Sequence, residues 1–190
     1  MRVYVPSTLR LLSAACNAGE VGPAPLTVYA VTPALREWYS EGDDEELEFA
    51  AMAQAARASV GLLAADPGTS RRRVVIAAEV SAVPPADGSV ELGDARLELH
   101  VVIPWRSVAS VHLDTAQATT VIGRAVDVWD AAHGVGLSGV DDDAVFALDS
   151  CEGEDLMWYA TQEIPDLLAA EGPRGRNGSA QGSAEAHGSN

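Results

Sequence analysis

The chain has no lysine: all twelve basic residues are arginine, against 28 acidic residues and a formal net charge of −16. A strongly negative surface repels phosphate at long range, and nucleic-acid binding needs clustered basic residues that displace counterions. The one basic run, Arg71–Arg73, precedes a strand-like segment. We interpret it as a solvent-exposed segment at the start of that strand. We therefore expect no binding to nucleic acid.

Long apolar runs are absent too, and none approaches the roughly 18 apolar residues of a membrane-spanning helix. The opening segment, MRVYVPSTL, has too short an apolar stretch for a secretion signal. Cys16 and Cys151 have neither metal-ligand spacing nor a C-x-x-C pattern. We expect a cytoplasmic protein with reduced thiols, no membrane contact, no metal and no cofactor, although the sequence leaves a disulfide between the two cysteines open.

Large aromatic residues are scarce, since Phe49 and Phe146 are the only phenylalanines. Hydrophobic residues make up 47% of the chain, and alanine and valine dominate them, so the core is expected to consist of small aliphatic groups. A chain of 190 residues suits one domain plus a tail. The abundance of alanine, glycine and arginine indicates a high-GC bacterial genome.

Apolar periodicity predicts strands alternating with helices. Strands are expected at about residues 2–5, 26–31, 73–80, 95–103 and 108–113, and at 156–164, where strand is favoured over helix. Helices are expected at about 7–17, 33–39, 44–65 and 115–132, and within 141–155. The sequence thus predicts a single α+β or α/β domain over residues 1–170, with one mixed β-sheet and helices packed against it. Residues 171–190 are rich in glycine and serine and are expected to form a disordered tail.

Four consecutive acids, Asp43–Glu46, could form a metal or catalytic site or begin a helix. Asp43 suits an N-cap with Glu46 completing a capping box, and acids in a first turn complement the helix dipole. Capping accounts for all four acids, so we favour it. Behind them, one apolar stripe begins at Leu47 and a second at Phe49, which predicts a helix largely buried against the sheet.

Two motif matches lack the context that their chemistry needs. Residues 134–139 fit G-x-G-x-x-G but follow a helix and precede three acids, where a phosphate would be repelled. Residues 141–152 begin like a calcium loop, but Phe146 occupies the position that requires glycine. We interpret that segment as a helix start with Phe146 anchoring its inner face.

A small acid–base enzyme is one functional hypothesis. His112 and Asp114 lie two residues apart near the end of a predicted strand, a spacing that could orient an imidazole for proton transfer. Glu37 or Glu163 could supply a further carboxylate. This hypothesis requires the side chains to converge in one pocket.

The aromatic residues favour a different hypothesis. Trp38, Tyr39, Trp105, Trp158 and Tyr159 all fall near the ends of predicted elements. Exposed Trp and Tyr are favoured in interfaces and ligand pockets, although the same rings could close the rims of a small-residue core. We favour a non-enzymatic cytosolic interaction or regulatory module that binds a protein or small ligand through an aromatic-rimmed surface. A homodimer across an uncovered sheet face is a further expectation.

Four stretches together resemble a known family: MRVYVPSTL, AVTPALREWYSEGDDEELEFAAM, IPWRSVASVHLD and LMWYATQEIPDLL. The family is an uncharacterised domain of unknown function from high-GC Gram-positive bacteria. The resemblance covers about residues 1–170 and implies a single cytosolic domain. Because none of these stretches carries known chemistry, it implies no catalytic or binding residues.

Overall fold

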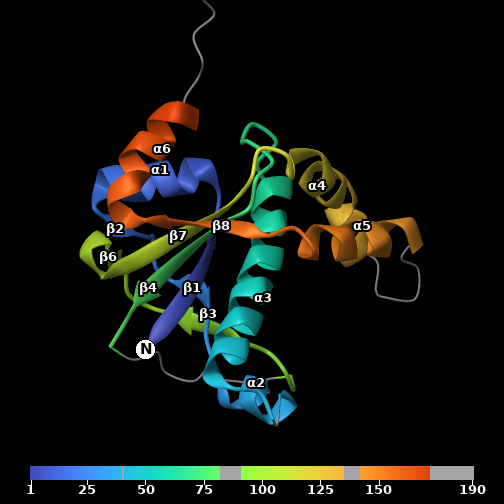
Figure 1. Ribbon diagram of the computed structural model, residues 1–190, viewed down its shortest axis with the longest axis horizontal. Helices are drawn as coiled ribbons and strands as arrows, with labels where there is room; N and C mark the ends of the chain where they lie inside the picture. Colours follow the sequence, from blue (N-terminus) through green and yellow to red (C-terminus); the bar gives the residue numbers. More distant parts are fainter. Residues whose placement is uncertain (40, 82–90, 135–141, 172–190) are drawn as a thin grey trace, which may run out of the picture.

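The computed structural model describes residues 1–39, 41–81, 91–134 and 142–171 (Figure 1). The strands are β1 (Arg2–Ser7), β2 (Glu20–Val21), β3 (Leu26–Tyr29), β4 (Val74–Glu79), β5 (Arg96–Leu99), β6 (Ile103–Pro104), β7 (Val108–Asp114) and β8 (Leu156–Ala160). The helices are α1 (Leu9–Ala18), α2 (Pro33–Trp38), α3 (Asp44–Ala64), α4 (Thr119–Gly134), α5 (Asp142–Glu152) and α6 (Ile164–Glu171). The predicted tail and residues 135–141 of the two motif matches lie outside the described residues.

Six strands form the main sheet in the order β5-β3-β1-β4-β7-β8, and β2 and β6 form a separate pair. This arrangement confirms the single α+β domain. The sheet was expected to be mixed, but every pairing among the described strands is antiparallel. Strands β3 and β4, which α2 and α3 connect, do run in the same direction. However, β1 lies between them and pairs with both.

Helices cover both faces of the sheet (Figure 1). α1 and α6 pack on one face, where the core includes Val3, Leu12 and Ile164. α3 crosses the other face, and α4 and α5 pack beyond α3 around a third apolar cluster. The core is made largely of small aliphatic side chains, as the composition indicates.

Local capping sets the helix starts. Thr8 accepts a hydrogen bond from Leu11 N, and Thr32 accepts one from Leu35 N. At α3, Asp43 Oδ1 accepts from Glu46 N at 2.9 Å, while Glu46 Oε2 accepts from Asp43 N at 3.2 Å. This capping box satisfies two otherwise unpaired backbone N–H groups, and it confirms the structural interpretation of the acidic run.

Three strands differ from the sequence pattern. The strand expected at 156–164 ends at Ala160, and a 3-10 turn (Thr161–Glu163) and α6 follow it. β5 ends at Leu99, and Val101, which was expected to point inward, is 60% exposed. In β7, Val108 is buried in place of the expected Ala109, because the register against β4 shifts between Ala77 and Ala78. A bulge of this kind adds one residue to one strand and reverses the face of those beyond it.

Helices α4 and α5 also differ from expectation. Neither Asp114 nor Thr115 caps α4, which begins at Thr119. In α5, Phe146 is 72% exposed, and Leu148 and Cys151 are buried in its place. The prediction that Phe146 anchors the inner face was therefore wrong. In the described part of the chain, no helix combines the length and apolar character needed to span a membrane.

Candidate functional site

A broad open groove lies between α2 and the first half of α3, with a volume of about 1150 Å³. We call it the aromatic groove. It is lined by Trp38, Tyr39, Glu41, Gly42, Glu45, Glu46, Phe49, Ala50, Ala53, Gln54, Arg57 and Glu152. Most of these residues come from one continuous segment, and Glu152 at the end of α5 joins them from far along the chain.

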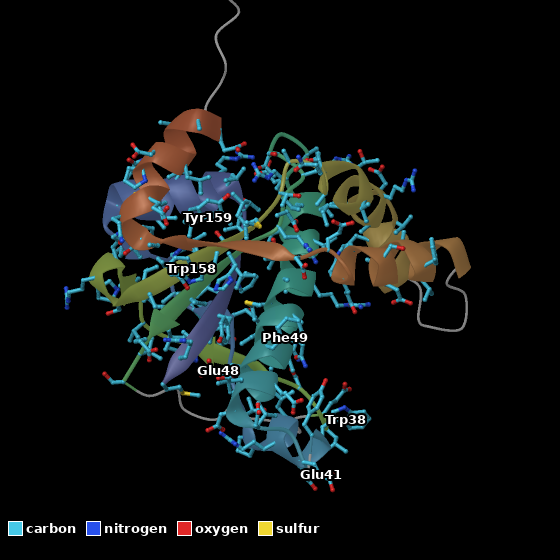
Figure 2. All side chains as sticks on the ribbon, viewed as in Figure 1. Trp38, Glu41, Glu48, Phe49, Trp158 and Tyr159 are labelled. Carbon is cyan, nitrogen blue, oxygen red and sulfur yellow. The ribbon has the colours of Figure 1, made fainter. Side chains whose placement is uncertain are left out.

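Three aromatic rings of the groove are exposed to solvent. Trp38 is 60% exposed, Phe49 is 65% exposed and Tyr39 is 43% exposed. Figure 2 shows Trp38 and Phe49 on the same side of α3. Isolated apolar side chains on a surface are ordinary, but large rings gathered at one concave place mark a binding surface.

The position of Trp38 is fixed by the loop beside it. Its ring packs over Gly93, whose φ is +87°, and a Cβ at Gly93 would lie only 3.2 Å from Trp38 Cγ. Gln54 of α3 holds the same loop, since Nε2 donates to Gly93 O at 2.8 Å and Oε1 accepts from Ala95 N at 3.0 Å. One flank of the groove is therefore built before any ligand binds.

Four carboxylates and one guanidinium line the groove. Arg57 is ion-paired with Glu152, and Glu46 is bonded in the capping box. Glu41 and Glu45 are exposed, and neither has a side-chain partner among the described residues. The groove thus combines exposed rings with two carboxylates free to accept hydrogen bonds.

The other predicted aromatic residues do not extend this surface. Trp158 is 60% exposed on β8 and does not line the groove, and Figure 2 shows it well apart from Trp38. Tyr159 and Trp105 are partly buried against the core on the opposite face of the sheet. On β8, one ring of the adjacent Trp–Tyr pair therefore faces each side, as alternation in a strand requires.

Phe49 is the groove residue that sequence reasoning placed wrongly, since it was expected to be buried. The buried stripe of α3 runs at steps of four from Leu47 through Ala51 and Ala55 to Ser59 and Leu63. At 100° per residue, position 49 lies about 200° from position 47 and hence on the opposite side. The second stripe is buried only further along α3, at Ala56 and Val60, whereas Phe49 near the start of the helix is exposed.

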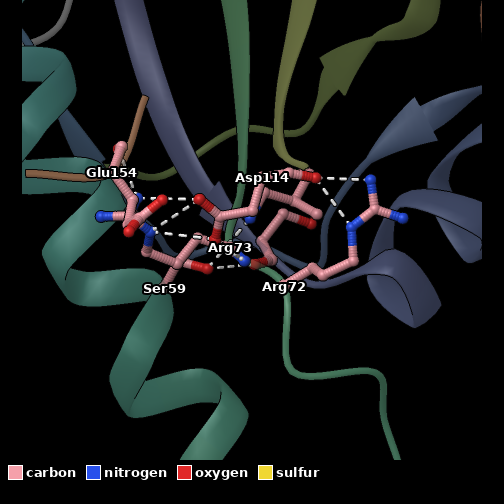
Figure 3. Close-up of polar contacts among 7 residues, drawn as sticks. Ser59, Arg72, Arg73, Asp114 and Glu154 are labelled. Atoms are coloured by element: carbon pink, nitrogen blue, oxygen red, sulfur yellow. Dashed lines mark hydrogen bonds and ion pairs between the residues drawn. The ribbon is translucent and has the colours of Figure 1, made fainter. Parts of the chain in front are cut away.

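The candidates for acid–base chemistry have separate partners. The imidazole Nε2 of His112 lies 3.3 Å from Ser110 Oγ, and burial, followed by the charge of Arg2, lowers the pKa of His112. Asp114 is fully buried and its carboxylate binds Arg73 (Figure 3). Because that ion pair occupies the carboxylate of Asp114, it does not orient His112.

Glu37 and Glu163 lie elsewhere. Glu37 is exposed on α2, and Glu163 Oε2 accepts a hydrogen bond from Ala160 N at 2.8 Å. Glu163 thus caps the short 3-10 turn after β8. The structure does not gather the four predicted side chains in one pocket. Among the described residues, no group of three or more His, Cys, Asp or Glu side chains could hold a metal ion.

The run Arg71–Arg73 is not the solvent-exposed segment that the sequence indicated. Arg72 is 5% exposed and Arg73 is 2% exposed. Arg72 Nε donates to Asp114 O at 2.7 Å, and its Nη1 donates to Glu171 Oε1 at 2.5 Å (Figure 3 shows the contact with Asp114). Arg71 Nη1 donates to Asp127 Oδ1 at 2.6 Å. All three guanidinium groups join distant elements of the fold.

Comparison with known proteins gives a family but no activity. Residues 1–168 match the model of a family of unknown function, DUF6912, and the chain belongs to that family. A search of curated proteins and a search of solved structures each found no match. The match confirms the resemblance to an uncharacterised domain, whereas the expected bacterial origin stays a prediction.

Proposed function

We propose that this chain is a non-enzymatic interaction module that binds a protein or small ligand in the aromatic groove. The observation that carries this proposal is the exposure of Trp38 and Phe49 at 60% and 65% in one groove. Burying apolar surface contributes roughly 25 cal/mol per Å², so rings held exposed in a concave site supply binding energy to whatever covers them. A cytoplasmic location remains part of the proposal, from the sequence alone.

Capture from a lysate of the source organism tests this function. Immobilised wild-type protein is compared with the variants Trp38→Ala and Phe49→Ala. The matched control is Phe146→Ala, because Phe146 is 72% exposed on α5 and does not line the groove. We expect a partner that wild type and the control retain and that both groove variants lose. Identical capture by all four proteins would contradict the proposal.

A second partner, another copy of the chain, is proposed on a different observation. The two edges of the main sheet are unlike: β5 exposes the charged side chains Arg96 and Glu98, whereas β8 has no charged residue and exposes Met157 and Trp158. Charges on an edge strand oppose pairing with other chains, and β8 lacks that protection. Antiparallel pairing of two β8 strands about a two-fold axis at Trp158 would set the two copies of that ring opposite each other.

Light scattering at micromolar concentration tests this homodimer. Trp158→Lys should shift the protein toward monomer, because two like charges would then face each other across the axis. Trp38→Lys adds the same charge at an equally exposed site and should leave the mass unchanged. A monomeric wild-type protein would dispose of the dimer and leave the groove proposal intact.

A further inference from the structure

The charges beside the rings of the aromatic groove restrict what can occupy it. Glu41, Glu45, Glu46 and Glu152 face a single basic residue, Arg57, which is already ion-paired with Glu152. The whole chain also carries a formal charge of −16. An anionic occupant would meet repulsion both at long range and at contact, and a neutral apolar one would leave Glu41 and Glu45 desolvated without a partner.

We propose that the aromatic groove binds an arginine-containing segment of a partner protein. This inference rests on the proposed function and specifies its ligand. The guanidinium groups stack on the faces of Trp38 and Phe49 and donate hydrogen bonds to the carboxylates of Glu41 and Glu45. Complementary charge and exposed rings in the same groove are the two observations that select a cation.

Arginine fits these walls better than lysine. A guanidinium is planar, is attracted to the face of an aromatic ring, and presents paired N–H donors that match a carboxylate. An ammonium group is a compact, strongly hydrated charge and gains less from stacking. The residue type that uses both the rings and the free carboxylates is therefore arginine.

The size of the groove favours a peptide over one small molecule. Its volume of about 1150 Å³ exceeds the roughly 300–1,000 Å³ of common small-ligand pockets, and it is open to solvent. Several residues of an extended chain would be needed to cover the rings. The Arg57–Glu152 ion pair, between α3 and α5, forms part of the groove wall.

Calorimetry with a defined probe tests the inference. The probe is a synthetic peptide in which arginine alternates with glycine, and the control peptide carries citrulline in place of every arginine. Citrulline keeps the planar shape and loses the charge. We expect the arginine peptide to bind at least about tenfold tighter than the citrulline peptide, with affinity falling as salt rises. A lysine peptide should bind less tightly than the arginine peptide.

Paired variants separate the groove from the general negative charge. Trp38→Ala should weaken binding of the arginine peptide by about tenfold, within the range of one cation–π contact. Phe146→Ala, which removes an exposed ring outside the groove, should not. The double variant Glu41→Gln/Glu45→Gln should weaken binding by about tenfold and reduce its salt dependence. The control Glu20→Gln/Asp166→Asn removes the same charge from exposed positions on β2 and α6 and should change affinity by less than about twofold.

The outcomes distinguish this inference from the proposed function. Equal weakening by the two charge-removing double variants, or equal affinity for the arginine and citrulline peptides, would overturn the arginine ligand. If lysate capture still depends on Trp38 in that case, the groove is a binding site for another class of ligand. If capture does not depend on Trp38 either, the proposed function itself is wrong.

Discussion

Arg73 and Asp114 form a buried ion pair that joins the start of β4 to the end of β7. Arg73 Nη2 donates to Asp114 Oδ1 at 2.8 Å, Nε donates to Oδ2 at 3.0 Å, and the two side chains are 2% and 0% exposed. Arg73 N also donates to Oδ2 at 2.6 Å, and Nη2 donates to Glu154 O at 2.7 Å (Figure 3). The carboxylate of Asp114 thus fixes the strand pairing, and the guanidinium of Arg73 also holds the segment that leads into β8.

Removing one member of this pair should destabilise the fold. Asp114→Ala leaves the buried charge of Arg73 without its partner, and such a loss costs about 3–5 kcal/mol. Urea denaturation measures the change in the free energy of unfolding. The double variant Arg73→Met/Asp114→Leu should lose much less than the sum of its component variants Arg73→Met and Asp114→Leu, because it leaves no unpaired charge. A single-variant loss below about 1 kcal/mol would contradict this structural role for Asp114.

Two helical glycines should respond oppositely to alanine. A Cβ at Gly61 in α3 would lie 2.8 Å from Trp129 Cζ2, so the ring must move. A Cβ at Gly123 in α4 would lie 3.4 Å from Arg71 Cδ, an ordinary contact with a flexible side chain. We expect Gly61→Ala to lose about 1–3 kcal/mol through overpacking, which outweighs its better helix propensity. Gly123→Ala should be neutral or gain up to about 1 kcal/mol. Thermal unfolding of both variants provides the comparison.

Tyr4 should make the fold sensitive to alkali. Burial, and then the charge and hydrogen bond of Glu48, raise the pKa of Tyr4 from 10.0 to about 12. Between these values the unfolded chain loses the phenolic proton and the folded chain keeps it, so stability falls as the pH rises from about 10 through 12. The contribution of Tyr4 is roughly 3 kcal/mol. Tyr4→Phe should flatten this part of the stability curve, measured by urea denaturation at several pH values; an unchanged slope would refute the assignment.

His112 should make the fold less stable at acidic pH, in contrast to Tyr4. Its pKa is lowered below 6.5 by burial and then by Arg2, so the folded chain takes up this proton at lower pH than the unfolded chain. Stability from this group is present above pH 6.5 and is lost as the pH falls through the folded value. Proton NMR of the imidazole measures the titration directly. Arg2→Gln should move the pKa of His112 upward, and no movement would exclude Arg2 as a cause.

Local order was largely accessible from the sequence. Thr32-Pro33 and the Asp43 to Glu46 pair define helix starts because each cap is made within three residues along the chain. The strands β1, β4 and β8 were predicted because β-forming residues occur in short bounded runs. These features depend on neighbouring residues in the chain, and the structure contains them as predicted.

Pairing across the chain was decided only by the tertiary structure. Arg72 and Arg73 look like a solvated run in the sequence, yet their partners Asp114 and Glu171 lie 41 or more residues away. Likewise, the groove exists because α5 brings Glu152 to Arg57 and a loop supports Trp38 from Gly93. The sequence by itself determined most of the helices and strands, since those signals are short-range, but it did not predict β2, β6 or α6. Burial, ion pairing and exposure depend on which distant segments meet, and the packing of the whole chain decides that.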